Sequence, residues 1–343
     1  MNKRLSIILA STAMVAFAPM VPTSAAAQAQ LQAAPPQFAP LPARPTQRAP
    51  GKHVNRVIDL WNKGQPVYYT GAGGGGYEDG KRLGATQADF INYNMEHGAL
   101  DFTKLREFMQ GLVDAGPTRT GHRTPPVIVT LPIQGTNDAV RANAWMIQQA
   151  LAAGIHGILL CNAESPEAVK AMIEASRYPF APEAVGLAQG YRGSGSQSFA
   201  STVWGLTPAE YMRVADAWPL NPDGELIFGL KIENPRAVVN VESSLRVPGL
   251  AFAEWGPGDN GFYLVGRPTG AGGGGDGRVD TPAMVAVRAR VLAATKATGL
   301  KFLNSCNERN VIDQLNDGVM ICTGGDTPAA AKGRAHSKRT DPT

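Results

Sequence analysis

Two acidic side chains end two consecutive apolar segments of the chain. Glu233 follows the run Leu-Ile-Phe-Gly-Leu-Lys-Ile at 226–232, and Asp259 closes the run Leu-Ala-Phe-Ala-Glu-Trp-Gly-Pro-Gly-Asp at 250–259. If both runs are parallel strands joined by a helix, their carboxyl ends lie at one rim of a sheet, where barrel enzymes carry their active sites. Carboxylate oxygens suit hard divalent cations. The pair therefore predicts a metal-dependent enzyme that binds Mg²⁺, Mn²⁺ or Co²⁺ through Glu233 and Asp259.

Apolar runs alternate with helical patterns along most of the chain. The candidate strands cover 67–71, 90–95, 127–132, 157–162, 185–189, 226–233, 250–256, 300–306 and 319–323. Helical patterns cover 102–115, 137–153, 166–176, 207–216, 236–245, 282–298 and 308–316. Repeated strand–helix alternation over this length predicts an α/β fold, a (β/α)8 TIM barrel of the phosphoenolpyruvate/pyruvate type. Nine candidates exceed eight positions, and we drop 185–189.

The two ends of the chain differ from this body. Lys3 and Arg4 precede an apolar stretch and small residues suited to cleavage, which predicts a signal peptide at 1–27. A Pro-, Ala- and Gln-rich linker follows at 28–50. The barrel is predicted at 51–330, and a frayed basic tail at 331–343. We therefore expect a periplasmic or secreted protein with no stable membrane association after cleavage.

The net charge limits the kinds of binding partner, and the cysteines limit the possible disulfides. Cleavage removes Lys3 and Arg4, so the formal net charge of +4 falls to +2. This near-neutral body argues against nucleic-acid binding and leaves a small-molecule substrate as the expected partner. Of the three cysteines, Cys306 and Cys322 fall on neighbouring predicted strands, where a disulfide and two buried thiols are both open alternatives.

A histidine follows the second predicted strand. His97 comes directly after Glu96, where a barrel strand meets its loop, and is a candidate acid/base. Two glycine runs, at 71–76 and 270–275, lack the Gly-Lys-Ser/Thr of a phosphate-binding loop. We interpret both runs as loops over the active-site mouth.

Four motifs occur together in the order of a known family. They are Met95-Glu96-His97-Gly98, then Arg177-Tyr178-Pro179 with Arg192-Gly193-Ser194-Gly195, then Lys231-Ile232-Glu233, then Gly256-Pro257-Gly258-Asp259. Over about residues 57–330 the chain resembles the metal-dependent (class II) 4-hydroxy-2-oxo-acid aldolases of the aldolase/citrate lyase family. The resemblance implies a carbon–carbon lyase and a homo-oligomer. It implies metal ligation by Glu233 and Asp259, proton transfer by His97, a substrate carboxylate near Gly258, and substrate contacts from Glu96 and Arg192.

The chain departs from the family pattern at its substrate-binding positions. The resemblance places an Arg that grips the carboxylate at Thr130, an Asp at Asn94, another near Ala152, and a Gln at Lys231. Threonine cannot supply a bidentate guanidinium clamp. Lys231 restores one positive charge, because residues two apart on a strand share a face. The departures favour an altered substrate or reaction. Aromatic side chains near the predicted loops would suit a bulkier or aromatic substrate, and their ordinary packing in the fold is the open alternative.

Two other hypotheses stay open. In the first, Lys231 forms a Schiff base with a carbonyl substrate, which requires a lowered lysine pKa. In the second, the missing Arg and Asp residues mark a decayed site in a non-catalytic periplasmic binding protein, because a fold alone does not carry function.

Overall fold

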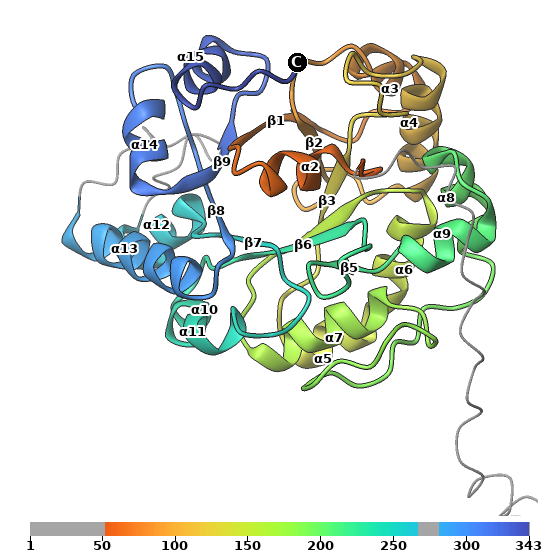
Figure 1. Cartoon of the computed structure of the whole chain (residues 1–343). Coiled ribbons are helices and arrows are strands. Elements are labelled where there is room, and N and C mark those ends of the chain that lie inside the picture. The colour runs from red at the N-terminus through yellow and green to blue at the C-terminus, as the bar shows by residue number, and fades with distance from the viewer. Residues whose placement is uncertain (1–51, 267–280, 343) are drawn as a thin grey trace, which may run out of the picture. The chain divides into compact units, whose positions relative to one another are not determined.

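The computed structural model describes residues 52–266 and 281–342, so the predicted signal peptide, the linker and the second glycine run lie outside the described residues. Parallel strands surround a common core (Figure 1). Their bounds are β1 Val67–Ala72, β2 Phe90–Asn94, β3 Val127–Leu131, β4 Gly157–Leu160, β5 Ala217–Trp218, β6 Leu226–Lys231, β7 Phe252–Glu254, β8 Lys301–Asn304 and β9 Val319–Thr323.

The sheet closes into the predicted barrel. Its order is β4-β3-β2-β1-β9-β8-β7-β6, and a further pairing between β4 and β6 completes the ring. All of these pairs are parallel. The two-residue β5 pairs only with the start of β6 and is not a barrel stave. The eight strands that we retained are confirmed as the staves.

Helices follow the strands in chain order. Their bounds are α2 Arg56–Asn62, α3 Tyr77–Leu83, α4 Phe102–Asp114, α5 Asn137–Ala142, α6 Ala144–Ala152, α7 Pro166–Ser176, α8 Gln197–Trp204, α9 Pro208–Val214, α10 Pro235–Val239, α11 Val241–Ser244, α12 Pro257–Val265, α13 Pro282–Ala297, α14 Val311–Asp317 and α15 Pro328–His336. Side-chain caps start several of them: Asp101, Thr136, Ser165, Asn234 and Thr281 each accept a backbone N–H of the first turn. Within the described ranges, none of these helices is both long and apolar enough to cross a membrane.

The barrel interior is dry at its amino-terminal end and polar at its carboxyl-terminal end. Helix α2 lies across the amino-terminal opening (Figure 1) and packs Val57, Ile58 and Trp61 against inward-facing strand side chains such as Phe90 and Ile227. Large apolar side chains buried here drive closure of the barrel. The charged side chains of Lys231 and Glu233 lie at the opposite rim.

One expectation about local structure is confirmed and one is wrong. Residues 185–189, the candidate that we dropped, form no strand, and Val185 is 97% exposed because this segment lies in a loop outside the barrel. The predicted basic tail at 331–343 is not frayed over its described part, because it contains the end of α15 and is held by ion pairs. Arg339 donates to Asp89 at 2.7 Å and has a side chain that is 1% exposed.

Candidate active site

Charged side chains from three strands meet at the carboxyl-terminal rim. Glu96 follows β2, Lys231 ends β6 and is followed two residues later by Glu233, and Glu254 ends β7. Parallel strands place their carboxyl ends on one side of a barrel, as the sequence predicted. Lys231 and Glu254 are also Cα partners in the register of β6 and β7. The rim therefore gathers three carboxylates around one ammonium group.

Lys231 joins two of these carboxylates. Its Nζ lies 2.7 Å from Glu96 Oε2 and 3.0 Å from Glu233 Oε2. The three side chains are 13%, 11% and 1% exposed, so this is a largely desolvated ion-pair network. Burial opposes the charge on Lys231, but Glu233 and the other neighbouring carboxylates outweigh it and raise the lysine pKa. Lys231 is consequently a fixed positive charge.

Glu233 is positioned by the ends of the neighbouring strands. Its Oε1 accepts the backbone N–H of Asn162 at 2.8 Å, and Asn162 adopts a left-handed conformation with φ 47° just after β4. The side chain of Asn234, the residue that caps α10, in turn donates to Asn162 Oδ1. Gly256 has φ +54°, and a Cβ at that position would lie 2.1 Å from Glu233 Cβ. These contacts hold the carboxylate against the rim and explain the glycine.

The carboxylates carry more negative charge than Lys231 neutralises. Burial raises the pKa of Glu233 to about 8, with Glu96 and Glu254 adding to the rise, while Lys231 and the Asn162 N–H oppose it. Burial likewise raises the pKa of Glu254, Lys231 opposes this, and Glu96 and Asp259 add to it. For both groups burial is the larger cause of the raised pKa, and repulsion from the neighbouring carboxylates adds to it. An added cation would relieve this repulsion.

The donor atoms suit a hard cation better than a soft one. Ligand atoms of Glu96, Cys161 and Glu233 lie within 4.8 Å of one another. Burial raises the pKa of the Cys161 thiol well above its usual range, and its Sγ donates to Leu131 O at 3.3 Å, so this group is a poor ligand. The oxygen donors and the unbalanced negative charge fit a divalent cation such as Mg²⁺.

Asp259, the second predicted metal ligand, lies in the first turn of α12, directly after the β7 rim. It is close enough to raise the pKa of Glu254, but it is not part of the three-residue donor group. Gly258 lies in the same turn, where helix N–H groups lack intrahelical acceptors. The structure thus brings Asp259 and Gly258 to the predicted rim and places Glu96, rather than Asp259, beside Glu233.

His97 lies at the outer edge of this cluster. Its Nε2 is 3.4 Å from Glu96 Oε2, and its side chain is 67% exposed. Asn94 shapes the turn that presents both residues, because its Oδ1 accepts the N–H groups of Glu96 and His97. An exposed imidazole beside a carboxylate is accessible to substrate and can exchange protons with it.

Two predicted substrate-binding positions, 130 and 192, do not present a free charged group at the rim. Thr130 is 2% exposed and donates to Asn92 Oδ1 at 2.9 Å, so it forms a neutral pair on the barrel wall. Arg192 is not at the rim. It is 1% exposed in the helical layer, where it donates to Tyr211 and packs over Tyr178. The Arg192 assignment is therefore wrong, because the side chain is enclosed between helices.

Tyr69 is a rim residue that we did not predict. It lies on β1, and its ring stacks on Phe90 at 5.1 Å. Burial raises the pKa of Tyr69, and the nearby Glu254 adds to this rise, while Lys231 opposes it. Its two-residue spacing from Val67, which faces the interior, is the signal that could have found it.

The chain is similar to a known protein over part of its length. No family model matches the chain. The hydroxypyruvate/pyruvate aldolase of Delftia acidovorans is 29% identical over 165 residues, which are 47% of this chain and 52% of that protein, so the match spans about half the length of the curated relative.

Solved structures show the same fold. An HpcH/HpaI aldolase/citrate lyase family protein from Burkholderia cenocepacia superposes with a TM-score of 0.60 at 18% identity, over 83% of this chain and 98% of that one. Macrophomate synthase superposes with a TM-score of 0.57 at 17% identity, over 92% and 97% of the two chains. The chain therefore has the barrel fold of HpcH/HpaI aldolase/citrate lyase family proteins and is similar in sequence, over about half its length, to a hydroxypyruvate/pyruvate aldolase.

Proposed function

We propose that the protein is a divalent-metal-dependent carbon–carbon lyase, which cleaves or forms an aldol bond through an enolate. The observation that carries the proposal is the cluster of Glu96, Lys231 and Glu233, in which buried carboxylates outnumber the one ammonium group. The barrel belongs to a fold whose solved examples include aldolases. Carboxylate oxygens at this rim of a barrel are the groups that a divalent-metal-dependent reaction requires.

Glu233 and Asp259 would hold the metal, as the resemblance implies, and Glu96, whose carboxylate lies in the same donor group as Glu233, would join them or orient the substrate. When bound, the divalent cation supplies Lewis-acid stabilisation of developing enolate charge. The N–H of Asn162 and the ammonium of Lys231 fix the Glu233 oxygens in advance of binding. The residues of the chain therefore contribute pre-organisation, which reduces the reorganisation needed during the reaction.

His97 would move the proton. In the cleavage direction its imidazole accepts the hydroxyl proton of the aldol, and the electrons of the O–H bond form the aldehyde carbonyl. The electrons of the broken carbon–carbon bond pass to the other fragment as an enolate, and a proton on its carbon then completes the ketone product. Glu96, 3.4 Å from His97, stabilises the imidazolium that forms.

The Schiff-base alternative is opposed by the structure. A Schiff base requires the neutral amine of Lys231, but the carboxylates of Glu96 and Glu233 stabilise its charged form. The raised pKa of Lys231 has the same consequence. We therefore assign Lys231 an electrostatic role, as the positive charge that sets the positions of both carboxylates.

The proposed substrate class follows from the absence of a guanidinium group at position 130. A neutral threonine bonded to Asn92 cannot grip a carboxylate as an arginine would. A hydroxy-oxo acid would then depend on the metal and the α12 N–H groups for its carboxylate. A bulkier, aromatic aldol with a weaker need for that clamp is the substrate class that the rim supports.

Export and assembly remain proposals. The bond between Cys306 and Cys322 supports an oxidising compartment, and Cys161 is a buried free cysteine. On α12, Phe262 and Tyr263 are 57% and 60% exposed, which supports contact with a second copy of the chain.

The test combines metal content with enolate formation. Mature protein purified without chelator should contain a stoichiometric divalent metal, and with added Mg²⁺ or Mn²⁺ it should exchange the methyl protons of pyruvate for deuterium. Glu233→Gln should lose the metal and slow exchange by about a hundredfold or more. Glu308→Gln, which alters an exposed carboxylate in the loop after β8, is the matched control.

The outcomes separate the competing functions. Exchange that persists without metal in Glu233→Gln would reject the proposed mechanism. Bound metal, with no exchange and no turnover on a panel of hydroxy-oxo acids and aromatic aldols, would favour the non-catalytic binding protein.

A further inference from the structure

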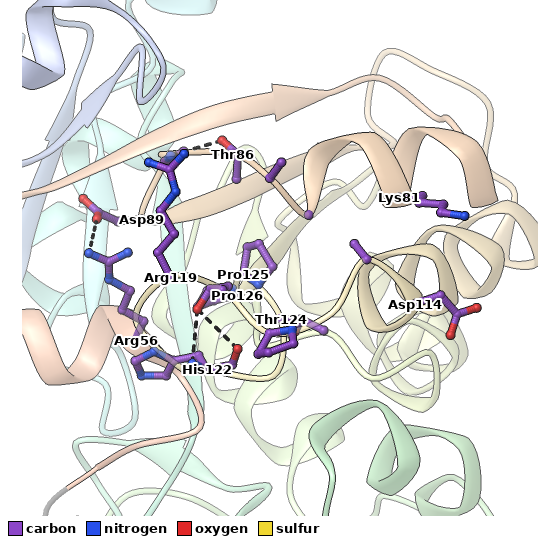
Figure 2. A pocket seen from close by; sticks show the side chains of 16 residues that line it. Arg56, Lys81, Thr86, Asp89, Asp114, Arg119, His122, Thr124, Pro125 and Pro126 are labelled. Carbon is purple, nitrogen blue, oxygen red and sulfur yellow. Dashed lines mark hydrogen bonds and ion pairs between the residues drawn. The ribbon is translucent and has the colours of Figure 1, made fainter. Parts of the chain in front are cut away.

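A polar cavity lies at the amino-terminal end of the barrel. The proposed active site lies at the other end of the strands. The walls of the cavity come from the ends of α3 and α4 and from the segments that lead into β2 and β3. The cavity has a volume of about 410 Å³ (Figure 2) and its charged lining includes Arg56, Lys81, Asp89, Asp114, Arg119 and His122. We refer to it as the N-terminal cavity.

Arg56 forms a rigid part of the wall. It is 6% exposed, begins α2, and its Nη2 lies 3.5 Å from Asp89 Oδ1 and donates to Pro342 O. Arg56 and His122 also line an adjoining cavity of about 410 Å³. A guanidinium held by packing presents its remaining donors with little loss of conformational entropy.

Positive charge exceeds negative charge behind this wall. Asp89 is 0% exposed and lies among three guanidinium groups, those of Arg56 at 3.5 Å, Arg334 at 3.7 Å and Arg339 at 2.7 Å. One carboxylate cannot neutralise three cations. In the described part of the chain, the Nε atoms of Arg334 and Arg339 and the hydroxyl of Tyr68 are buried without a hydrogen-bond partner. The group therefore has unused donors and unbalanced charge.

The pKa directions agree with this imbalance. Burial lowers the pKa of Arg56, Asp89 opposes this, and the charges of Arg339 and Arg334 lower it further. The pKa of Arg334 is lowered by burial and by Arg339 in the same way, again against Asp89. An anion close to these groups would relieve their repulsion.

Arg119 supplies a second, accessible guanidinium. It is exposed, and its side chain makes no hydrogen bond or ion pair with residues 52–266 and 281–342. Figure 2 shows Arg119, Arg56, Asp89 and His122 toward one end of the cavity, and Lys81 and Asp114 toward the other. The cationic end is thus open to a ligand.

Carboxylates near the cavity are engaged elsewhere. Asp326 accepts the Thr86 hydroxyl at 2.7 Å, and Asp114 accepts bonds from Tyr77 and Gln110. Asp341 pairs with Lys63. Asp341 also acts on Arg56 electrostatically, but less than Asp89, Arg339 and Arg334 do.

We propose that the N-terminal cavity binds a small organic anion, whose carboxylate or phosphate group lies between Arg56 and Arg119. Planar guanidinium groups pair with such oxygens in a bidentate manner. Pro125 and Pro126 supply an apolar wall for a short carbon skeleton, and Thr124 supplies a hydroxyl. The site is independent of the proposed lyase reaction, since it lies at the other end of the strands.

Calorimetric titration of the full chain tests this site with two probes, inorganic phosphate and succinate, at ionic strength held constant with sodium chloride. Saturable binding of at least one probe is expected, and the preferred probe identifies phosphate or carboxylate as the recognised group. Because hydrogen bonds to charged groups are strong, Arg119→Gln should weaken binding about tenfold or more, and Arg119→Glu should abolish it.

The control is Arg246→Gln, which removes an exposed arginine from another segment leading into a strand, after α11. It should bind the probe as the unmodified protein does. Arg119 is exposed, so its variants should fold, and equal melting temperatures in chloride would establish this. No saturable binding of either probe, or unchanged binding in both Arg119 variants, would overturn the proposal. Neither result would affect the lyase assignment.

Discussion

The Nζ of Lys231 lies 2.7 Å from Oε2 of Glu96, although the strands that carry them are separated by β3 and β4 in the barrel wall. The pair thus spans the interior of the rim rather than two neighbouring strands. The same ammonium contacts Glu233, so one lysine fixes the two carboxylates that the proposed reaction requires. Substitutions at this position should affect stability and metal binding together.

Replacement of Lys231 by Met should destabilise the fold in a pH-dependent way. Removing one partner of a buried ion pair costs about 3–5 kcal/mol when the other charge is left unpaired. Because the pKa of Glu233 is raised to about 8, the folded state takes up a proton on this group that the unfolded state does not hold at neutral pH. Stability therefore falls as pH rises between about 5 and 8, and more steeply in the variant.

Urea unfolding at pH 5 and pH 9, with and without Mn²⁺, measures this effect. The variant should lose least stability at pH 5, and Mn²⁺ should restore part of it at pH 9. Lys104→Met is the control, since its ion pair with Glu107 is exposed and contributes little. An equal loss at both pH values, with no effect of Mn²⁺, would contradict the electrostatic role of Lys231.

Thr130→Arg should shift the substrate preference toward carboxylates. The variant places a guanidinium where the resemblance implies a carboxylate clamp, at a buried position facing Asn92. We expect the rate of deuterium exchange into pyruvate, as kcat/KM, to rise about tenfold, at a cost in stability of about 1–3 kcal/mol from overpacking. Thr130→Val serves as the control without added charge, and an Arg variant with no gain over Val would contradict the substrate argument.

His97→Gln should separate activity from stability. The side chain is 67% exposed, so the free energy of unfolding should change by less than about 0.5 kcal/mol. Loss of the acid/base should slow turnover about 10²- to 10⁴-fold. Paired unfolding and exchange measurements check this. Full activity in the variant would remove His97 from the mechanism and leave Glu96 as the proton acceptor.

Local pattern predicted the strands well because each barrel stave is a short apolar run bounded by polar or glycine residues. The exceptions are instructive. β5 has only two residues, Ala217 and Trp218, too few for a periodic pattern. Residues 185–189 have the composition of a strand but lack a neighbour to pair with, and tertiary packing leaves Val185 in solvent.

Contacts between residues close in sequence could be predicted at the site, and contacts between distant strands could not. Lys231 and Glu233 share a face because they are two residues apart on one strand. Their contact with Glu96 depends on the relative placement of β2 and β6, which no short segment encodes. Arg192 shows the reverse case: its motif occurs in family order, but the direction of its side chain is set by packing against Tyr178 and Tyr211.

The disulfide should contribute measurable stability. Cys306 and Cys322 are bonded across a sequence separation of 16, between the segment after β8 and strand β9. Closing a loop of this size stabilises a fold by about 3 kcal/mol through its effect on the unfolded chain. Urea unfolding with and without dithiothreitol should show this loss. Cys161→Ser is the control, and a reductant effect that persists in a Cys306→Ala/Cys322→Ala double variant would contradict the assignment.

Acid should destabilise the barrel through His156. This residue is 1% exposed, its Nδ1 accepts the N–H of Val127 at 3.2 Å, and its ring stacks on Trp204. Burial, with a smaller effect of His122, lowers its pKa to about 3. The unfolded state, with an ordinary pKa near 6.5, binds the proton more readily. Stability is therefore complete above pH about 6.5 and is lost as pH falls toward 3, by roughly 4 kcal/mol.

His156→Asn isolates the contribution of His156 to the pH dependence of stability, because the amide oxygen of Asn can accept the Val127 N–H and does not titrate. The variant should be less stable at pH 7, since it leaves space beside Trp204, yet its stability should fall less between pH 6.5 and pH 4 than that of the unmodified protein. His336→Asn, at an exposed position on α15, should leave the pH dependence unchanged. Parallel pH profiles for His156→Asn and the unmodified protein would show that other buried groups cause the acid sensitivity.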